Sequence, residues 1–98
     1  SRKLLFNNSE HLGKGLIDAG FYIQSHSPIV SIITGKNEPT IKFRDHLESN
    51  GVFGSVFCYP ATPKDMALIR FTVNSEIKRR QLDVIIETAK SGKKYLEI

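Results

Sequence analysis

Arg70 is the residue of this sequence whose type and setting best suit chemistry, because it interrupts an apolar strand pattern at residues 67–73. Side chains of a strand alternate between its two faces. One face of this segment is apolar and holds Ile69, Phe71 and Val73, whereas Arg70 shares the other with Leu68 and Thr72. A planar guanidinium donates two parallel hydrogen bonds to a carboxylate. From spacing alone, a carboxylate-binding arginine and an ordinary solvent-facing arginine are equally good interpretations.

The loop before this segment contains further groups that could line a site. It begins at Tyr59 and runs to residue 65. Pro60 and Pro63 stiffen it, because proline fixes φ and lacks a backbone N–H. Tyr59 is interpreted either as lining a substrate cleft or as an aromatic side chain packed within the loop. Cys58 has no histidine close in sequence, so we expect a small buried apolar side chain rather than a nucleophile.

The three histidines, His11, His26 and His46, show no metal-ligand spacing with one another or with acidic residues. We therefore predict no metal site and assign them no role in catalysis. A single cysteine excludes an internal disulfide, a two-cysteine redox motif and a cysteine-rich zinc site. It fits a reducing compartment, so we expect a cytoplasmic protein.

The composition is typical of one globular domain. The sequence has 98 residues, of which 40% are hydrophobic and 24% charged, a balance unlike that of a disordered chain. Its apolar runs are far shorter than the ~20 residues that span a bilayer. Ser1-Arg2-Lys3 is not followed by a secretory leader. We expect a single domain without a membrane partner.

Lysine and arginine outnumber the acidic residues by 14 to 10, which gives a net charge of +4. This balance permits nucleic-acid binding without arguing for it. Six of the 14 basic side chains fall on one predicted helix and its tail: Lys78, Arg79, Arg80, Lys90, Lys93 and Lys94. A solvated helix face is the preferred interpretation. The sequence also lacks an RNP-like aromatic strand and a Gly-x-x-Gly clamp, so we expect no nucleic-acid partner.

The predicted elements that position these residues are helices and strands in a mixed order. Helical spacing of apolar side chains covers about residues 2–19, about residues 39–49, and a last stretch that Asn74 or Ser75 caps. Alternating or β-branched runs predict strands at residues 29–34, 52–58 and 67–73. This order indicates an α+β fold with a three-stranded, mostly antiparallel sheet and the helices packed on one face.

The first predicted strand is apolar on both faces, with Ile29 and Ile33 on one side and Val30 and Ile32 on the other. If the helices cover one face of the sheet, the other face holds apolar side chains together with Arg70. A monomeric domain rarely leaves a large apolar patch exposed. We therefore expect this face to contact another domain or subunit, and the chain to be part of something larger.

Two segments carry a resemblance to a known family. Residues 51–60 and 68–75 resemble the carboxyl-terminal domain of the α-oxoamine synthases, and residues 20–21, 27–30 and 35 match that family's spacing. These are pyridoxal-phosphate (PLP) enzymes of fold type I, similar to class II aminotransferases, that condense an amino acid with an acyl-CoA. Residues 44–58 resemble most closely the branch that makes the α-hydroxyketone quorum-sensing autoinducer of vibrios.

Two departures from the general family pattern favour the same branch. Most members carry Arg-Pro-Pro-Thr-Val-Pro where this sequence has Cys-Tyr-Pro-Ala-Thr-Pro at residues 58–63. They also carry a histidine where this sequence has Ile77. The autoinducer branch tolerates such differences.

The resemblance implies that residues 1–98 are the small carboxyl-terminal domain of a larger enzyme, whose cofactor-binding domain is absent from this chain. The Schiff-base lysine would lie in that missing domain. We therefore expect no catalytic residue here, and neither PLP binding nor activity by this fragment alone. Arg70 is expected to bind the substrate carboxylate, and Tyr59 and Pro60 to line the cleft. The implied partners are the large domain, a second subunit of a homodimer, an amino-acid donor and acyl-CoA.

Two functions follow as alternatives. In the first, the full-length protein is a transferase that condenses an amino-acid donor with a medium-chain acyl-CoA, making an α-hydroxyketone or aminoketone autoinducer. In the second, the chain is a free-standing α+β binding module whose basic helix contacts RNA or a partner protein. The reading frame upstream of Ser1 distinguishes them, because several hundred codons with a Ser-x-x-Lys-type cofactor lysine would support the first.

Overall fold

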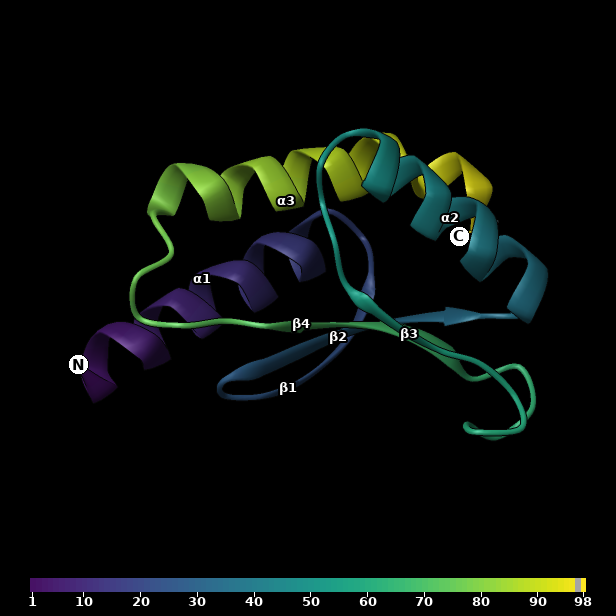
Figure 1. The fold of residues 1–98 in the computed structure, drawn as a ribbon, viewed down its shortest axis with the longest axis horizontal. Helices are drawn as coiled ribbons and strands as arrows, with labels where there is room; N and C mark the ends of the chain where they lie inside the picture. Colours follow the sequence, from purple (N-terminus) through teal and green to yellow (C-terminus); the bar gives the residue numbers. More distant parts are fainter. Residues whose placement is uncertain (97) are drawn as a thin grey trace.

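Helices and strands alternate along the chain, which a computed structural model describes for residues 1–96 and 98. The elements in these residues are α1 (Arg2–Asp18), β1 (Tyr22–His26), β2 (Ile29–Gly35), α2 (Asn37–Ser49), β3 (Ser55–Phe57), β4 (Ala67–Thr72), α3 (Arg79–Ser91) and a short 3₁₀ helix, η1 (Lys93–Tyr95). The α-helices all lie on the same side of the sheet (Figure 1). The predicted α+β fold with helices on one face is thereby confirmed.

The sheet has the strand order β1-β2-β4-β3, and every neighbouring pair is antiparallel. Within the described residues it has four strands where the sequence predicted three. The additional strand is β1, which pairs with β2 from Tyr22↔Ile33 to His26↔Ile29. β1 is an edge strand with mostly exposed side chains. It therefore lacks the apolar alternation that reveals a strand in a sequence.

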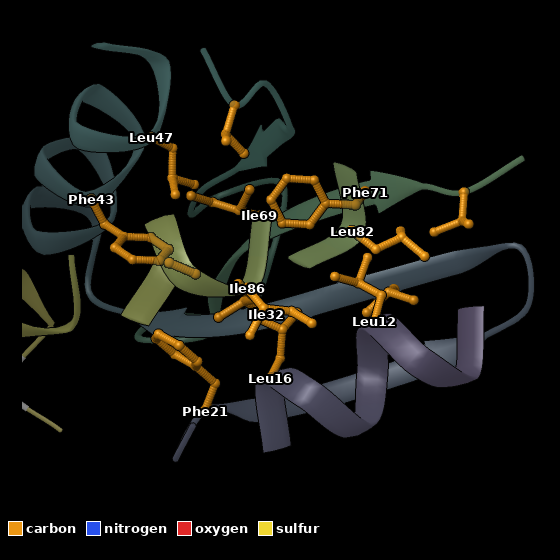
Figure 2. Packing of buried hydrophobic residues seen from close by; sticks show 14 of the residues in the cluster. Leu12, Leu16, Phe21, Ile32, Phe43, Leu47, Ile69, Phe71, Leu82 and Ile86 are labelled. Atoms are coloured by element: carbon orange, nitrogen blue, oxygen red, sulfur yellow. The ribbon is translucent and has the colours of Figure 1, made fainter. Parts of the chain in front are cut away.

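The core fills the space between the helices and the sheet. Figure 2 shows Leu12 and Leu16 of α1, Phe43 and Leu47 of α2, and Leu82 and Ile86 of α3 facing Ile32, Ile69 and Phe71 of the central strands. The Phe21 and Phe43 rings meet with their centroids 5.8 Å apart. Because this core is closed by the chain's own elements, we expect the 98-residue chain to fold by itself.

The last helix begins later than the sequence predicted. Asn74 does not cap it; its Oδ1 instead accepts hydrogen bonds from the backbone N–H groups of Glu76 and Ile77, both at 2.9 Å. This side chain closes a turn of its own before the helix starts. Lys78 occupies the N-cap position, and its backbone N–H donates to Gln81 Oε1 at 2.8 Å. The predicted cap at Asn74 or Ser75 is therefore wrong.

Among the residues that the structure describes, no helix combines the length and the apolar character needed to cross a membrane. The same residues contain no group of histidine, cysteine and acidic side chains arranged to hold a metal ion.

Replacing Leu82 by alanine is expected to lower the free energy of unfolding of the 98-residue chain by about 2–5 kcal/mol. Leu82 is fully buried, so the substitution removes apolar contacts and leaves a cavity. Val84 on the same helix is 53% exposed, and Val84→Ala should change the same quantity by no more than about 0.5 kcal/mol. Urea unfolding followed by circular dichroism measures both. Equal losses in the two variants would contradict the described packing.

Candidate functional site

The sheet face that the helices leave uncovered carries side chains in rows that run across the strands. The register places Gln24 opposite Ser31, Ser31 opposite Arg70, and Arg70 opposite Ser55. We call these four residues the polar row. A more apolar row lies beside it and consists of Tyr22, Ile33, Leu68 and Phe57. Arg70 therefore stands near the middle of a polar strip on a face that is otherwise largely apolar.

The Arg70 side chain is half-buried and only partly satisfied. Its Nε is buried and has no hydrogen-bond partner within residues 1–96 and 98. The guanidinium carbon lies 4.5 Å from the centroid of the Phe57 ring. A buried donor without a partner costs about 1–3 kcal/mol. A carboxylate in the plane of the guanidinium would meet its terminal N–H groups, and would reach the covered Nε–H only if the side chain or its neighbours moved. Arg70 is therefore a half-buried arginine, and not a fully solvent-exposed one.

Tyr59 and Pro60 lie just past the end of β3, in a loop that extends from the sheet away from the helices (Figure 1). Two hydrogen bonds fix the loop to the start of α2: Asn37 Nδ2 donates to the Tyr59 carbonyl at 3.3 Å, and the Tyr59 N–H donates to Asn37 Oδ1 at 3.2 Å. Both residues are exposed. The ring that lies over the Arg70 guanidinium is that of Phe57, two residues before Tyr59.

Cys58 is half-buried rather than fully buried as the sequence suggested. Its carbonyl accepts hydrogen bonds from the N–H groups of Ala61 and Thr62 at 2.8 and 3.3 Å. These bonds form the first turn of the loop. The backbone of Cys58 is therefore held by hydrogen bonds within the loop.

An apolar hollow of about 530 Å³ adjoins the rim of the same face. Its lining includes Tyr22 and Ile33 from the apolar row, and Met66, the residue just before β4. Tyr22 and Met66 are exposed. Sequence analysis missed this hollow because it depends on β1, which was not predicted as a strand.

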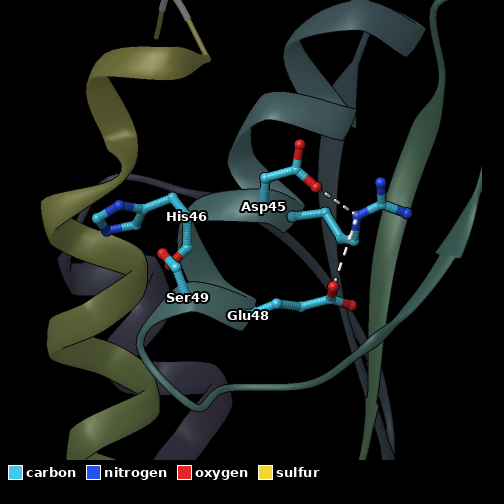
Figure 3. A network of polar contacts seen from close by, with 5 residues as sticks. Asp45, His46, Glu48 and Ser49 are labelled. Carbon is cyan, nitrogen blue, oxygen red and sulfur yellow. Dashed lines mark hydrogen bonds and ion pairs between the residues drawn. The ribbon is translucent and has the colours of Figure 1, made fainter.

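The histidines make contacts between elements. His11 Nε2 lies 2.7 Å from Asp83 Oδ1 and so joins α1 to α3. His46 Nε2 lies 2.8 Å from Ser91 Oγ and joins α2 to α3. Figure 3 shows His46 directed toward the last helix. Within α2, Arg44 Nε lies 3.0 Å from Asp45 Oδ1 and 4.0 Å from Glu48 Oε1. Of these contacts, the one between His46 and Ser91 ties α2 to another helix.

The basic side chains of the carboxyl-terminal part are exposed, apart from Lys93. The Lys93 ammonium donates a hydrogen bond to the Ala19 carbonyl at 2.7 Å. Asp83 and Glu87 lie exposed on the same helix. The predicted solvated helix face is confirmed.

Comparison with curated proteins finds relatives along almost the whole chain. It is 37% identical over 97 residues to the CAI-1 autoinducer synthase of Vibrio campbellii. It is 32% identical over 95 residues to the serine palmitoyltransferase of Bacteriovorax stolpii, and 33% identical over 87 residues to the 8-amino-7-oxononanoate synthase of Alkaliphilus oremlandii. These alignments cover 99%, 96% and 88% of this chain. The chain belongs to the α-oxoamine synthase family.

The chain spans about a quarter of the length of these relatives: 25%, 23% and 22%. No family model matches it.

Solved α-oxoamine synthases have the same fold over this part of their chains. The serine palmitoyltransferase of Sphingomonas wittichii superposes with a TM-score of 0.90 at 25% identity, covering 98% of this chain and 25% of that one. The 8-amino-7-oxononanoate synthase of Francisella tularensis gives a TM-score of 0.81 at 26% identity, covering 99% and 28%. The fold is that of the carboxyl-terminal domain of serine-palmitoyltransferase-like enzymes. The predicted resemblance is confirmed in sequence and in fold.

Proposed function

We propose that residues 1–98 are the small carboxyl-terminal domain of a longer PLP-dependent enzyme that condenses an amino acid with an acyl-CoA. The relatives that support this proposal are synthases and a transferase about four times as long as the chain. In this proposal the domain supplies part of the substrate site and has no activity by itself.

The observation that carries the proposal is the buried Nε of Arg70, which has no hydrogen-bond partner among the described residues. This side chain lies in the middle of a sheet face that no helix covers. The resemblance of residues 68–75 to the family supports this role, because it implies a carboxylate-binding arginine at this position. In the complete enzyme Arg70 would bind the α-carboxylate of the amino-acid donor, and Tyr59 and Pro60 would line the rim of the cleft.

The cofactor belongs elsewhere in this proposal, because the lysines of this chain do not fit a PLP site. Eight of the nine are exposed, and the half-buried Lys93 donates to the Ala19 carbonyl. A stable Schiff base needs a lysine in a site closed to water. PLP would supply the electron sink for the condensation when bound by the large domain.

The finer assignment is an autoinducer synthase that uses a medium-chain acyl-CoA and makes an α-hydroxyketone or aminoketone. It is supported by the 37% identity to a CAI-1 autoinducer synthase, against 32% and 33% to the two other relatives described above. The single cysteine is consistent with a cytoplasmic enzyme.

The partners in this proposal are the large domain and a second subunit of a homodimer. The uncovered face is the surface that suits such a contact, because it combines the apolar row with the adjoining apolar hollow. Apolar surface of this kind is normally covered in a mature protein. The alternative of a free-standing module with a basic helix has less support, since acidic side chains share the exposed face of α3.

The experiment that tests the proposal is a condensation assay on the full-length gene product loaded with PLP. A panel of single amino acids is combined with octanoyl-CoA or decanoyl-CoA, and the released CoA thiol is followed with a thiol reagent. We expect thiol release that requires both one amino acid and the acyl-CoA. Thiol release that does not depend on any amino acid would refute the proposal, as would its absence across the whole panel.

A further inference from the structure

The contact between Phe57 and Arg70 gives Phe57 a role that its sequence position did not indicate. We propose that Phe57 is a positioning residue: its ring holds the Arg70 guanidinium in the orientation that receives the substrate carboxylate. This inference rests on the proposed function, since it concerns the same site. It goes beyond that function by assigning the selectivity for a carboxylate to a pair of residues.

The sheet register brings the two side chains together. Phe57 pairs with Leu68, and Arg70 pairs with Ser55, so Phe57 and Arg70 are diagonal neighbours on adjacent strands. Both lie on the uncovered face, and long or aromatic side chains reach each other at this spacing. The guanidinium carbon lies 4.5 Å from the ring centroid, well inside the distance of about 6 Å at which the ring attracts a cation.

The contact leaves the hydrogen-bonding edges of the guanidinium free. The guanidinium carbon lies over the Phe57 ring, and a phenyl ring has no lone-pair acceptor for the five N–H donors of the guanidinium. The Nε donor accordingly has no partner among the described residues, although it is buried. Phe57 therefore immobilises the arginine without competing with a bound anion.

Immobilising the arginine in advance strengthens binding. A flexible arginine loses side-chain freedom when it binds a carboxylate, and a pre-ordered one loses less. Ser55, directly opposite Arg70, is exposed. On the other side of Arg70, Ser31 is a short side chain. Because the Phe57 ring lies against the guanidinium, we expect the orientation of Arg70 to depend on Phe57.

Two substitutions at Phe57 distinguish the effect of its aromatic ring from the effect of its size. Phe57→Leu keeps an apolar side chain but removes the ring, whereas Phe57→Tyr keeps the ring. Phe53→Leu makes the same change at a phenylalanine that is 70% exposed in the preceding loop, and serves as the control. Phe57→Met provides a second ring-free variant should Phe57→Leu fail to fold.

The test measures equilibrium binding of the amino acid that is most active in the condensation assay, in the PLP-loaded full-length gene product without acyl-CoA. Phe57→Leu should weaken this binding roughly 2- to 30-fold. Phe57→Tyr and Phe53→Leu should stay within about twofold of the unsubstituted protein, and so should the Michaelis constant for acyl-CoA in every variant. Binding of the matching amine without the carboxylate, ethanolamine if the amino acid is L-serine, should not respond to Phe57→Leu.

A double substitution decides whether Phe57 acts through Arg70. In an Arg70→Ala background, Phe57→Leu should change amino-acid binding by less than about twofold, because there is no guanidinium left to orient. An equal weakening in both backgrounds would overturn the inference. So would an unchanged affinity in Phe57→Leu when Arg70→Ala alone weakens binding. If Arg70→Ala alone has no effect, the proposed function of Arg70 is what fails.

Discussion

Replacing Arg70 by alanine is expected to lower kcat/KM for the amino-acid donor roughly 10- to 150-fold in the full-length enzyme. The reason is the loss of a charge-assisted pair with the donor carboxylate, which is worth about 1.5–3 kcal/mol. Arg70→Lys retains the charge but loses the planar fork, so it should recover only part of this loss. The Michaelis constant for acyl-CoA should change much less, because in the proposed site Arg70 binds the carboxylate of the amino acid and not the thioester.

Steady-state kinetics with each substrate varied in turn measures these effects. Arg80→Ala is a suitable control, because Arg80 is an exposed arginine on α3 and should leave both constants unchanged. A value of kcat/KM for the amino-acid donor that stays within about threefold in Arg70→Ala would make the arginine structural.

The 98-residue chain alone is expected to form no lasting adduct with PLP and to release no CoA from acyl-CoA. Its exposed lysines form imines that water hydrolyses, and Lys93 is engaged with the Ala19 carbonyl. The measurement is the absorption spectrum after incubation with PLP and exhaustive dialysis, together with a thiol assay. Full-length gene product treated in the same way is the positive control, and should keep its absorption band and its activity. A stoichiometric, dialysis-resistant adduct on one lysine of the short chain would contradict the domain assignment.

Local patterns were sufficient to predict the helices and the central strands. Leu12 and Leu16 recur at helical spacing on the buried side of α1, and Ile69 and Phe71 alternate as strand residues do. β1 could not be found in this way, since Gln24, Ser25 and His26 carry no apolar signal. Its structure comes from pairing with β2. The start of α3 was misplaced because Asn74 suits a cap and a turn equally well, and the contacts around it decide between them.

Only one feature of the candidate site could be predicted from the sequence, namely the face of β4 on which Arg70 lies. Alternation within β4 was enough to separate Arg70 from the core side chains. The polar row and the Phe57 contact depend on how β2 and β3 pair with β4, and a shift of one residue would turn every side chain to the other face. The contact of Phe57 with Arg70 therefore had no signal in the sequence, because it depends on the register that pairs Phe57 with Leu68.

The strand order also determines when the domain is able to fold during synthesis. β2 pairs on one side with β1, which has already been made, and on the other with β4, which leaves the ribosome only after α2 and β3. Until then β2 presents a row of unpaired backbone groups beside apolar side chains, which is the kind of edge on which nascent chains aggregate. A ribosome that stalls before residue 67 would leave this edge open. The nascent chain therefore depends on continued elongation, or on a chaperone that shields β2, until β4 has been completed.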